Sequence, residues 1–432
     1  MTALFLVLFL LLIVVVGMPM TGAIFGVTWP FALLTGGAIT PKEVIDGIVA
    51  GASSTVCITI LLFLLVGTIM EKASLTDKIF NVFAYFFGKK KGFLPIIAIL
   101  TCAFFGMISG SGIATTAAVG AMTLPLLIDT GYNKAFCAAI LACAGCNGAL
   151  IPPSNSLNTM AGITNLELVS LYKISAAGGF TYVAILIVIA YVFCVKHADD
   201  VDQNAVDAKV DILRERGIIS VLKEGIWTLL LPVIVLGGIF SGILSAAEAA
   251  AVATIYAMFI SVFIYKTVKP SEVFAVFRQG VNAAAPLMAL YCGITLFGNA
   301  LEALGFNVAL AEFVQRSNVG LTGLTLLILA VMFLSGCVMD SGVAMLLLIS
   351  MFYETLLAMG CEPYSFMVGY IFVQMTGMLT PPFGQCMFVA CRLGKVKVGE
   401  IAPWLMVMCS IMLAIGVFIV LCPGLFSWAL PV

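Results

Sequence analysis

Charged residues and histidine are scarce in this sequence. Of its 432 residues only 9% are charged and one is a histidine, His197, whereas 62% are hydrophobic. Soluble domains carry about 25% charged residues, so this composition excludes a soluble globular fold and indicates a membrane protein. The net charge of −1 gives no electrostatic basis for binding nucleic acid.

Motifs for enzymatic chemistry are also missing. No GxxxxGK[ST] phosphate-binding loop occurs, so this chain does not itself hydrolyse ATP. An intramembrane enzyme needs a converging nucleophile and base or a metal cluster, and the sequence has no HExxH, GxSxG or paired-Asp motif. The 13 cysteines lie in apolar stretches, and the close pair Cys143 and Cys146 has no histidine nearby. We therefore interpret them as small hydrophobic residues rather than as zinc ligands or redox centres.

Long hydrophobic runs dominate the sequence. A membrane-crossing helix needs about 20 mostly apolar residues, and the runs predict about ten crossings plus several shorter pieces. The first spans are expected near 2–18, 22–40 and 47–70, and later ones near 225–243, 247–265 and 278–300. Their helical period excludes an outer-membrane barrel. Because no basic residue precedes Lys42, residues 1–20 are predicted to be a span rather than a cleaved signal peptide.

The polar segments divide the chain into two halves. We expect a first half at 1–195, a cytoplasmic linker at 196–224, which is the one long polar stretch, and a second half at 225–432. If the N-terminus is periplasmic, 17 of the 20 Lys and Arg residues lie in cytoplasmic loops. The opposite orientation would invert this count, so the positive-inside rule favours a periplasmic N-terminus.

The two halves resemble each other at offsets of 229 to 231 residues. Ser111-Gly112 aligns with Ser341-Gly342, and Gly148 with Ile151-Pro152-Pro153 aligns with Gly377 with Thr380-Pro381-Pro382. Under the predicted topology the halves have opposite orientations. Inverted-topology repeats are typical of alternating-access transporters, which bind substrate and coupling ion near the membrane midplane.

Residues 94–128 predict a re-entrant helical hairpin. Two apolar arms of about 15 residues flank Ser109-Gly110-Ser111-Gly112, and at 1.5 Å per residue each arm is about 23 Å long, less than the hydrocarbon core. The tip would bring serine hydroxyls, backbone carbonyls and a helix N-terminus to the midplane. The alternative is a glycine-rich packing face between two ordinary helices.

A broken helix is predicted from about Ala135, interrupted at Pro152-Pro153. Two prolines free upstream carbonyls, which is unfavourable in lipid unless the break lines a cavity or is buried in protein. Freed carbonyls can hold Na+, a hard cation that prefers oxygen ligands. The Asn155 amide and the hydroxyls of Ser154 and Ser156 can donate to a carboxylate. A structural kink without a binding role is the alternative.

The second half is predicted to contain a re-entrant hairpin and a broken helix as well. Asp340 with Ser341 is expected at the tip of a second hairpin, and the segment from Thr380 through Pro381-Pro382 to Gln385 at a second break. An acid within apolar sequence is a functional candidate by default. Three roles are open to Asp340: binding Na+, carrying a coupling proton, or capping and orienting the hairpin tip.

These segments resemble the large membrane subunit of the tripartite ATP-independent periplasmic (TRAP) transporters. The resemblance covers almost the whole chain and rests on GMISGSGIATTAAVG, GALIPPSN, SGILSAAEAAAVAT and GMLTPPFGQ, in that order. It implies an all-α polytopic membrane protein of the bacterial inner membrane, with two inverted-topology repeats, each with a re-entrant hairpin and a broken helix. It further implies an elevator-type mechanism, with scaffold parts at 1–70 and 225–300 and transport-domain parts at 93–195 and 320–425.

The resemblance also implies ligands and partners. The implied Na+ site residues are Ser109, Gly110, Ser111, Gly112, Pro152, Asp340, Ser341, Gly377, Thr380 and Pro381. The implied substrate-binding residues are Ser111, Ser154, Asn155, Ser341 and Gln385. The function implied is Na+-coupled import of a small organic acid of the sialic acid or C4-dicarboxylate type, delivered by a periplasmic substrate-binding protein.

Two further expectations follow. The sequence has no additional N-terminal stretch for a fused small subunit, so the small four-helix membrane subunit is expected as a separate chain. Ser154-Asn155-Ser156 is also similar to the SNT sequence of divalent-anion symporters, so a self-sufficient Na+/dicarboxylate symporter is the alternative function. A passive channel is disfavoured because a site between two tips favours occlusion.

Overall fold

The computed structural model describes residues 2–34, 40–90, 92–196, 201–306, 308–309, 312, 320–338, 341–382 and 384–431. Within these ranges the chain forms helices joined by turns and contains no strand. Seven of these helices are long and apolar enough to cross a membrane. The prediction of an all-α polytopic membrane protein is confirmed, although the sequence led us to expect about ten crossings.

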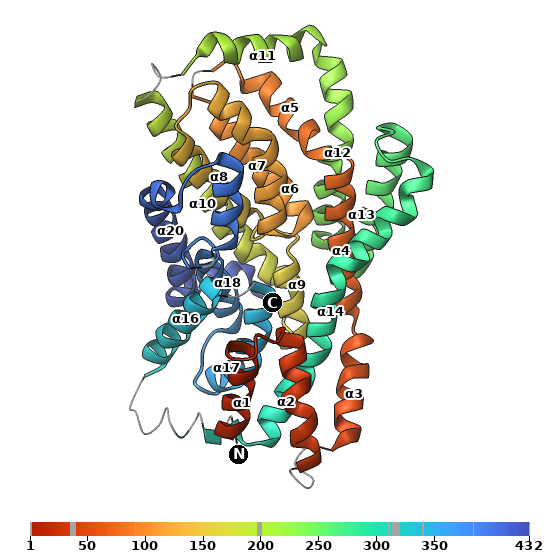
Figure 1. Cartoon of the computed structure of the whole chain (residues 1–432), viewed down its shortest axis with the longest axis vertical. Helices are drawn as coiled ribbons and strands as arrows, with labels where there is room; N and C mark the ends of the chain where they lie inside the picture. Colours follow the sequence, from red (N-terminus) through yellow and green to blue (C-terminus); the bar gives the residue numbers. More distant parts are fainter. Residues whose placement is uncertain are drawn as a thin grey trace.

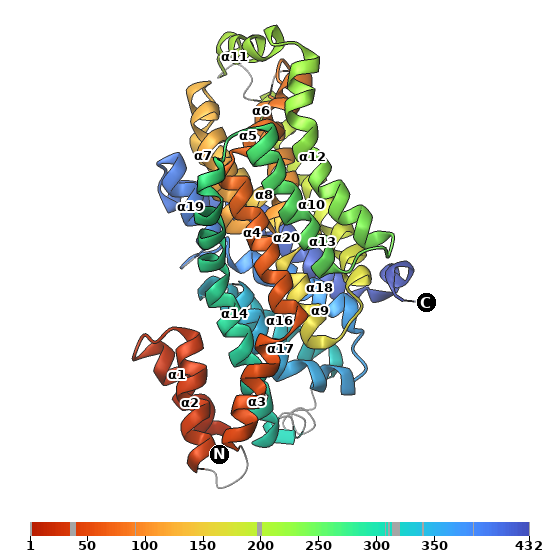
Figure 2. The ribbon, with the colours of Figure 1, turned by 90° about the vertical axis from the view of Figure 1, so that its right-hand side faces the viewer.

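The N-terminal helices pack on one long helix and form a hydrophobic cluster of their own. α1 (Thr2–Val14), α2 (Met20–Leu34) and α3 (Pro41–Ala52) lie beside the lower part of α14 (Val273–Ala303) in Figure 2. The rings of Phe5 and Phe9 in α1 lie 5.3 and 4.8 Å from the ring of Phe297 in α14. With 13 and 15 residues, α1 and α2 are shorter than the spans predicted at 2–18 and 22–40.

One predicted span consists of two helices. The sequence predicted a continuous crossing at 47–70, but α3 ends at Ala52 and α4 (Thr55–Lys72) begins after a turn. Ser54 between them has an extended backbone, and its hydroxyl accepts a hydrogen bond from the Val56 N–H. A serine here satisfies a backbone donor in the first helical turn and fixes the start of α4. The prediction was wrong because the apolar run continues on both sides of this capping residue.

Long helices form one side of the molecule. α4 packs against both α14 and α13 (Ala246–Phe259), and α13 packs against α12 (Ile218–Phe240). Ser245 and Glu248 form a capping box at the start of α13, in which the Ser245 N–H donates to the Glu248 carboxylate at 2.8 Å. A π-helical turn (Ile260–Ile264) and a short 3-10 turn (Pro270–Glu272) connect α13 to α14.

The predicted linker 196–224 contains helical structure. α11 (Gln203–Glu215) lies across the top of the molecule in Figure 1, and α12 begins within the linker at Ile218. Lys89 forms an ion pair with Asp211 of α11. The amphipathic helix α5 (Leu75–Phe87) packs against α11.

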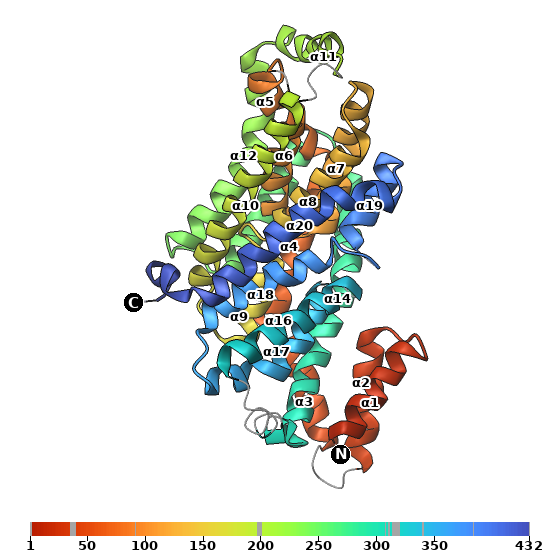
Figure 3. The ribbon, with the colours of Figure 1, turned by 90° about the vertical axis from the view of Figure 1, so that its left-hand side faces the viewer.

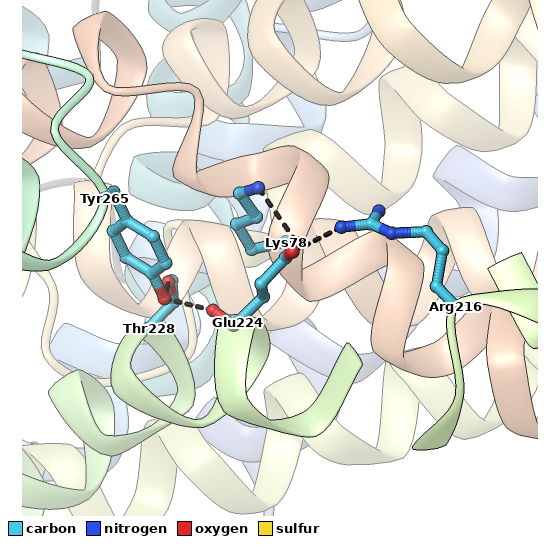
Figure 4. A network of polar contacts seen from close by, with 5 residues as sticks. All are labelled: Lys78, Arg216, Glu224, Thr228 and Tyr265. Carbon is cyan, nitrogen blue, oxygen red and sulfur yellow. Dashed lines mark hydrogen bonds and ion pairs between the residues drawn. The ribbon is translucent and has the colours of Figure 1, made fainter. Parts of the chain in front are cut away.

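A polar network fixes α5 against α12 (Figure 4). The Glu224 carboxylate of α12 pairs with Lys78 of α5 at 3.1 Å and with Arg216. The Tyr265 hydroxyl donates to the main-chain carbonyl of Glu224 and lies 3.0 Å from the Thr228 hydroxyl. The charged side chains are 26 to 42% exposed. Each pair at such a position contributes about 0.2–1 kcal/mol, so the network mainly sets the orientation of α5.

The remaining helices occur as two sets in the same order. The first set is α6 (Leu94–Ser109), α7 (Gly112–Asp129), α8 (Lys134–Gly148), α9 (Asn155–Thr164) and α10 (Leu168–Lys196). The second is α16 (Leu321–Val338), α17 (Ser341–Ala358), α18 (Pro363–Gly377), α19 (Gln385–Gly394) and α20 (Val398–Leu421), followed by a 3-10 helix (Pro423–Ala429). Figures 1 and 3 show α6 and α7 in the upper half and α16 and α17 in the lower half. Inverted repeats require that the two hairpins lie in opposite halves of the molecule, as they do here. The inversion itself stays a prediction.

Glycines let the helices of each set touch through their backbones. A Cβ atom on Gly106 of α6 would lie 2.3 Å from the Cα of Gly148 in α8. In the second set, a Cβ on Gly336 of α16 would lie 2.3 Å from the carbonyl oxygen of Gln374 and 3.2 Å from the Cα of Gly377, both in α18. Small residues permit this approach in membrane helix packing, and here they bring the ends of α6 and α8 together.

We predict that Gly148→Ala destabilises the protein. The new Cβ would lie 2.7 Å from the Cys102 carbonyl oxygen and 2.9 Å from the Gly106 Cα, so backbone must move. Overpacking of this kind costs about 1–3 kcal/mol, visible as a lower midpoint of thermal denaturation in detergent. Gly237→Ala is the matched control because nothing lies within 4 Å of its Cβ position in α12. Equal midpoints for the two variants would contradict the backbone contact.

Candidate functional site

The tip of the first hairpin is a short, internally bonded turn. α6 ends at Ser109, Gly110 adopts the left-handed conformation with φ of 60°, and Ser111 caps α7 by accepting a hydrogen bond from the Ala114 N–H. The hydroxyls of Ser109 and Thr115 lie 2.9 Å apart, and Thr115 donates to the Ser111 carbonyl at 2.7 Å. Ser109 is 1% exposed, so the tip lies inside the protein. The returning arm α7 has 18 residues and is longer than the arm predicted.

The predicted break in the first helix is present. α8 ends at Gly148, residues 149–154 form the break, and α9 begins at Asn155. The Ser154 hydroxyl caps α9 by accepting a hydrogen bond from the Leu157 N–H. Both prolines of the break, Pro152 and Pro153, are buried. A break buried in protein is the condition under which irregular backbone is tolerated at membrane depth.

The hairpin tip and the helix break meet each other. The Asn155 side-chain amide donates a long hydrogen bond of 3.5 Å to the Ser109 carbonyl. A Cβ on Gly110 would lie 2.9 Å from the same amide nitrogen, and one on Gly112 would lie 3.0 Å from the Cα of Cys146 in α8. Glycine at both positions therefore allows the two interrupted elements to approach each other.

A cleft of about 90 Å³ lies at this meeting point. Its polar lining comes from the hairpin tip and from the start of α9, and its apolar lining from α4, α14, α17 and the end of α18. The lining residues are Gly110, Ser111, Gly112, Ile113, Asn155, Ser156, Thr159, Ile60, Leu64, Leu287, Met345, Met375 and Met378. The volume is sufficient for a few water molecules or a small ion with part of an organic acid.

Three helix ends meet at the cleft. The C-terminal end of α6 presents carbonyl groups, and the N-terminal ends of α7 and α9 present N–H groups. A helix end carries roughly half an elementary charge, negative at the C-terminus and positive at the N-terminus. The same small volume thus offers a favourable potential for a cation on one side and for an anion on the other.

Three buried side-chain oxygens near the break positions have no hydrogen-bond donor within the described residues. They are Oδ1 of Asn147, Oδ1 of Asn155 and Oε1 of Gln385. Buried polar atoms are normally hydrogen-bonded, so an unmet acceptor is a feature of sites that take a cation or a donor group. Asn155 and Gln385 occupy the same position in the two sets, the first residue of α9 and of α19.

The other predicted site residues are placed as follows. Ser341 begins α17 and Gly377 ends α18. The Thr380 hydroxyl donates to the Thr376 carbonyl at 2.9 Å, and Pro381 is exposed, unlike Pro152. Ser154 is fully buried and lies outside the cleft lining because its hydroxyl caps α9. Asp340 lies outside the described residues.

The cleft includes residues that sequence reasoning missed. Thr159 lies four residues after Asn155, on the same face of α9, and that spacing is the one signal that pointed to it. Ile60, Leu64 and Leu287 come from long apolar helices and carry no motif. Only the tertiary packing of α4 and α14 against the hairpin brings them to the site.

The membrane-spanning helices and the interior site between interrupted helices define a polytopic membrane protein of the transporter class. The chain belongs to the family of the DctM component of the tripartite ATP-independent periplasmic transporters, whose family model matches residues 3–421. The resemblance noted in the sequence is therefore confirmed.

Relatives of this chain are named for different substrates. The chain is 29% identical over 384 residues to the sialic acid TRAP transporter large permease protein SiaM of Vibrio cholerae, covering 88% of this chain and 87% of that protein. It is 29% identical to the C4-dicarboxylate TRAP transporter large permease protein DctM of Pseudomonas aeruginosa, covering 80% of each chain. It is 27% identical to the isethionate TRAP transporter permease protein DctMQ of Oleidesulfovibrio alaskensis, of which it spans 54%.

A solved structure shares the fold. The YdaH transporter of Alcanivorax borkumensis superposes with a TM-score of 0.70 over 100% of this chain and 99% of that one, at 14% sequence identity. At this identity the likeness shows a common architecture and nothing about substrate. The helical arrangement is therefore one that a transporter adopts.

We predict that Gly110→Ala destabilises the hairpin tip more than an equivalent change elsewhere. A left-handed residue other than glycine costs roughly 1–2 kcal/mol, and here the added Cβ would also lie 2.9 Å from the Asn155 amide. Gly360→Ala is the control because Gly360 has φ of 83° but no atom within 4 Å of its Cβ position. Thermal denaturation should rank wild type, Gly360→Ala and Gly110→Ala in falling order of midpoint; the reverse order of the two variants would contradict contact between tip and break.

Proposed function

We propose that this chain imports a small organic acid of the sialic acid or C4-dicarboxylate type, driven by Na+ influx, as the large membrane subunit of a TRAP transporter. The observation that carries this proposal is the cleft where the hairpin tip meets the broken helix. It combines backbone carbonyls and hydroxyls, which suit Na+, with two helix N-termini, which suit a carboxylate.

The proposed Na+ ligands come from interrupted backbone. In the first half they are oxygens of Ser109, Gly110, Ser111 and Gly112 together with the break at Pro152. In the second half they are oxygens of Asp340, Ser341, Gly377, Thr380 and Pro381. The unmet Oδ1 of Asn155 supports an ion near the first site, since a cation would satisfy a buried acceptor that has no donor among the described residues.

The proposed substrate site lies between the two tips. Ser111 and Asn155 line the cleft, while Ser341 and Gln385 occupy the equivalent places in the second half. The relatives are named for sialic acid, C4-dicarboxylate, ectoine and isethionate, all of which carry a carboxylate or sulfonate group. An anionic group is thus the shared feature, and the Ser111 hydroxyl and Asn155 amide, with the N-termini of α7 and α9, match it.

The distribution of polar and apolar groups supports an elevator mechanism. The polar lining of the cleft belongs to 93–195, which we assign to the transport domain, whereas Ile60, Leu64 and Leu287 belong to scaffold parts at 1–70 and 225–300. An apolar wall makes no hydrogen bonds to the tip and can slide past it with little loss of free energy. The rest of the transport domain is assigned to 320–425.

Partners and location complete the proposal. We place the chain in the bacterial inner membrane with its N-terminus in the periplasm, as the distribution of Lys and Arg residues favours. It would work with a small four-helix membrane subunit as a separate chain and with a periplasmic substrate-binding protein that delivers the acid. The alternative is a Na+/dicarboxylate symporter that needs neither partner.

Reconstitution in liposomes tests the need for partners. With a Na+ gradient, uptake of the acid should require the binding protein and the small subunit, because this chain supplies the membrane pathway but not the capture step. Liposomes that contain all three proteins without a Na+ gradient are the control. Uptake by this chain alone would favour the self-sufficient symporter and contradict the tripartite assignment.

Substitutions at the tips test the ion sites. Ser111→Ala removes a hydroxyl at the cleft and Asp340→Asn removes a charge at the second tip, so both should reduce Na+-dependent uptake severalfold without abolishing folding. Uptake rates are measured against Na+ concentration in the full reconstituted system. An unchanged Na+ dependence in both variants would remove these residues from the coupling sites.

A further inference from the structure

α10 contacts the first helix break and its two flanking helices through three hydrogen bonds. They join the Ser175 hydroxyl to the Leu150 carbonyl at 2.5 Å, the Tyr172 hydroxyl to Oδ1 of Asn158 at 2.5 Å, and Nδ2 of Asn147 to the Gly179 carbonyl at 3.1 Å. The contacts on α10 are spaced by three and four residues, so they lie on one face of the helix. All six residues are buried.

Ser175 holds a carbonyl that the break would otherwise leave without a donor. Leu150 lies in the turn after α8, where the chain leaves the helical path, and no backbone N–H among the described residues donates to its carbonyl. The Ser175 hydroxyl, which is 1% exposed, donates to this carbonyl. Removing the hydroxyl would leave a buried acceptor, and the loop would have to move to satisfy it.

Tyr172 ties α10 to the first turn of α9. Its hydroxyl donates to Oδ1 of Asn158, whose backbone N–H in turn donates to the Ser154 carbonyl at the start of α9. Ser154 is the residue that caps α9 beside Asn155. The phenol therefore controls where the N-terminus of α9, and with it the Asn155 side chain in the cleft, is placed.

Direct packing reinforces these bonds. A Cβ on Gly179 of α10 would lie 2.8 Å from Cγ1 of Ile151, a residue of the break, so the helix backbone lies against the loop. Asn147 spans the same gap from the last turn of α8. The break is thus fixed at its beginning, its middle and its end by one helix.

The second half has no polar equivalent at these positions. α9 and α10 correspond to α19 and α20 at an offset of 230 residues, as their first residues show. Tyr172, Ser175 and Asn158 then correspond to Ala402, Leu405 and Phe388. None of these side chains can donate or accept a hydrogen bond, so the side-chain support of the first break is particular to the first half.

We infer that Tyr172 and Ser175 are positioning residues that set the Na+ affinity of the first site. The inference rests on the proposed function, because it concerns the ion that the hairpin tip and the break would share. Neither residue lines the cleft. They act by holding the oxygens of the break and Asn155 in place, as outer-shell hydrogen bonds do for ligands of other metal ions, where their loss lowers affinity by about 10- to 100-fold.

A Na+ titration of thermal stability tests the inference on the full-length chain in detergent. Na+ replaces choline at constant ionic strength, and the Na+ concentration that gives half of the stabilisation is recorded. Tyr172→Phe and Ser175→Ala should each raise this concentration about tenfold. Ser175→Cys, which is slightly larger and keeps a weak donor at this position, should give an intermediate value. Ser410→Ala is the control because its exposed hydroxyl donates to the Val407 carbonyl of its own helix.

The outcomes separate a positioning role from a structural one. A merely structural role would lower the midpoint of denaturation at every Na+ concentration and leave the half-saturating Na+ concentration equal to that of the wild type. That result would overturn this inference but not the proposed function. A wild type that Na+ does not stabilise at all would refute the proposed Na+ coupling and the inference with it. A raised half-saturating concentration in the two variants but not in Ser410→Ala is the result that we expect.

Discussion

The interruption of a membrane helix is the constraint on which the rest of this structure depends. A chain inside the bilayer cannot leave backbone N–H and C=O groups without partners, so an interrupted helix persists only where protein or a bound ligand satisfies them. Here both the tip of the hairpin and α10 contact the break after α8. Gly106 and Gly148 allow that contact because their backbones touch. At the cleft, protein groups do not satisfy every backbone and side-chain oxygen, so oxygens are left to bind a ligand.

Sequence reasoning predicted the parts whose signals are local. The Ser-Gly-Ser-Gly motif predicted a turn at the tip, and Gly110 has the left-handed conformation that such a turn needs. The Pro152-Pro153 pair predicted the break, and the offset near 230 predicted the matching helices of the second half. The turn and the break are each set by residues within a few positions of one another, and the repeat is visible because both local motifs recur, which is why a single sequence was sufficient.

The remaining features depend on tertiary contacts. Ser54 divides an apolar run that looks continuous, and α11 forms in a stretch whose polarity suggested only a linker. Tyr172 and Ser175 lie in an apolar helix of 29 residues, and their partners lie 14 and 25 residues away along the chain. No local pattern marks such residues, since a hydroxyl in a membrane helix bonds its own backbone as readily as a neighbour.

The two halves share one architecture but differ in the side chains at the breaks. The central claim is that an ion binds where the first hairpin tip meets the first break. A density map of the protein in Na+ and a carboxylate substrate, at a resolution that separates ions from water, tests that claim most directly. The account predicts a cation surrounded by oxygens of the Ser109 to Gly112 turn and of residues 149–154. A map in which this space holds no ion, while the same sample shows Na+-dependent uptake, would contradict it.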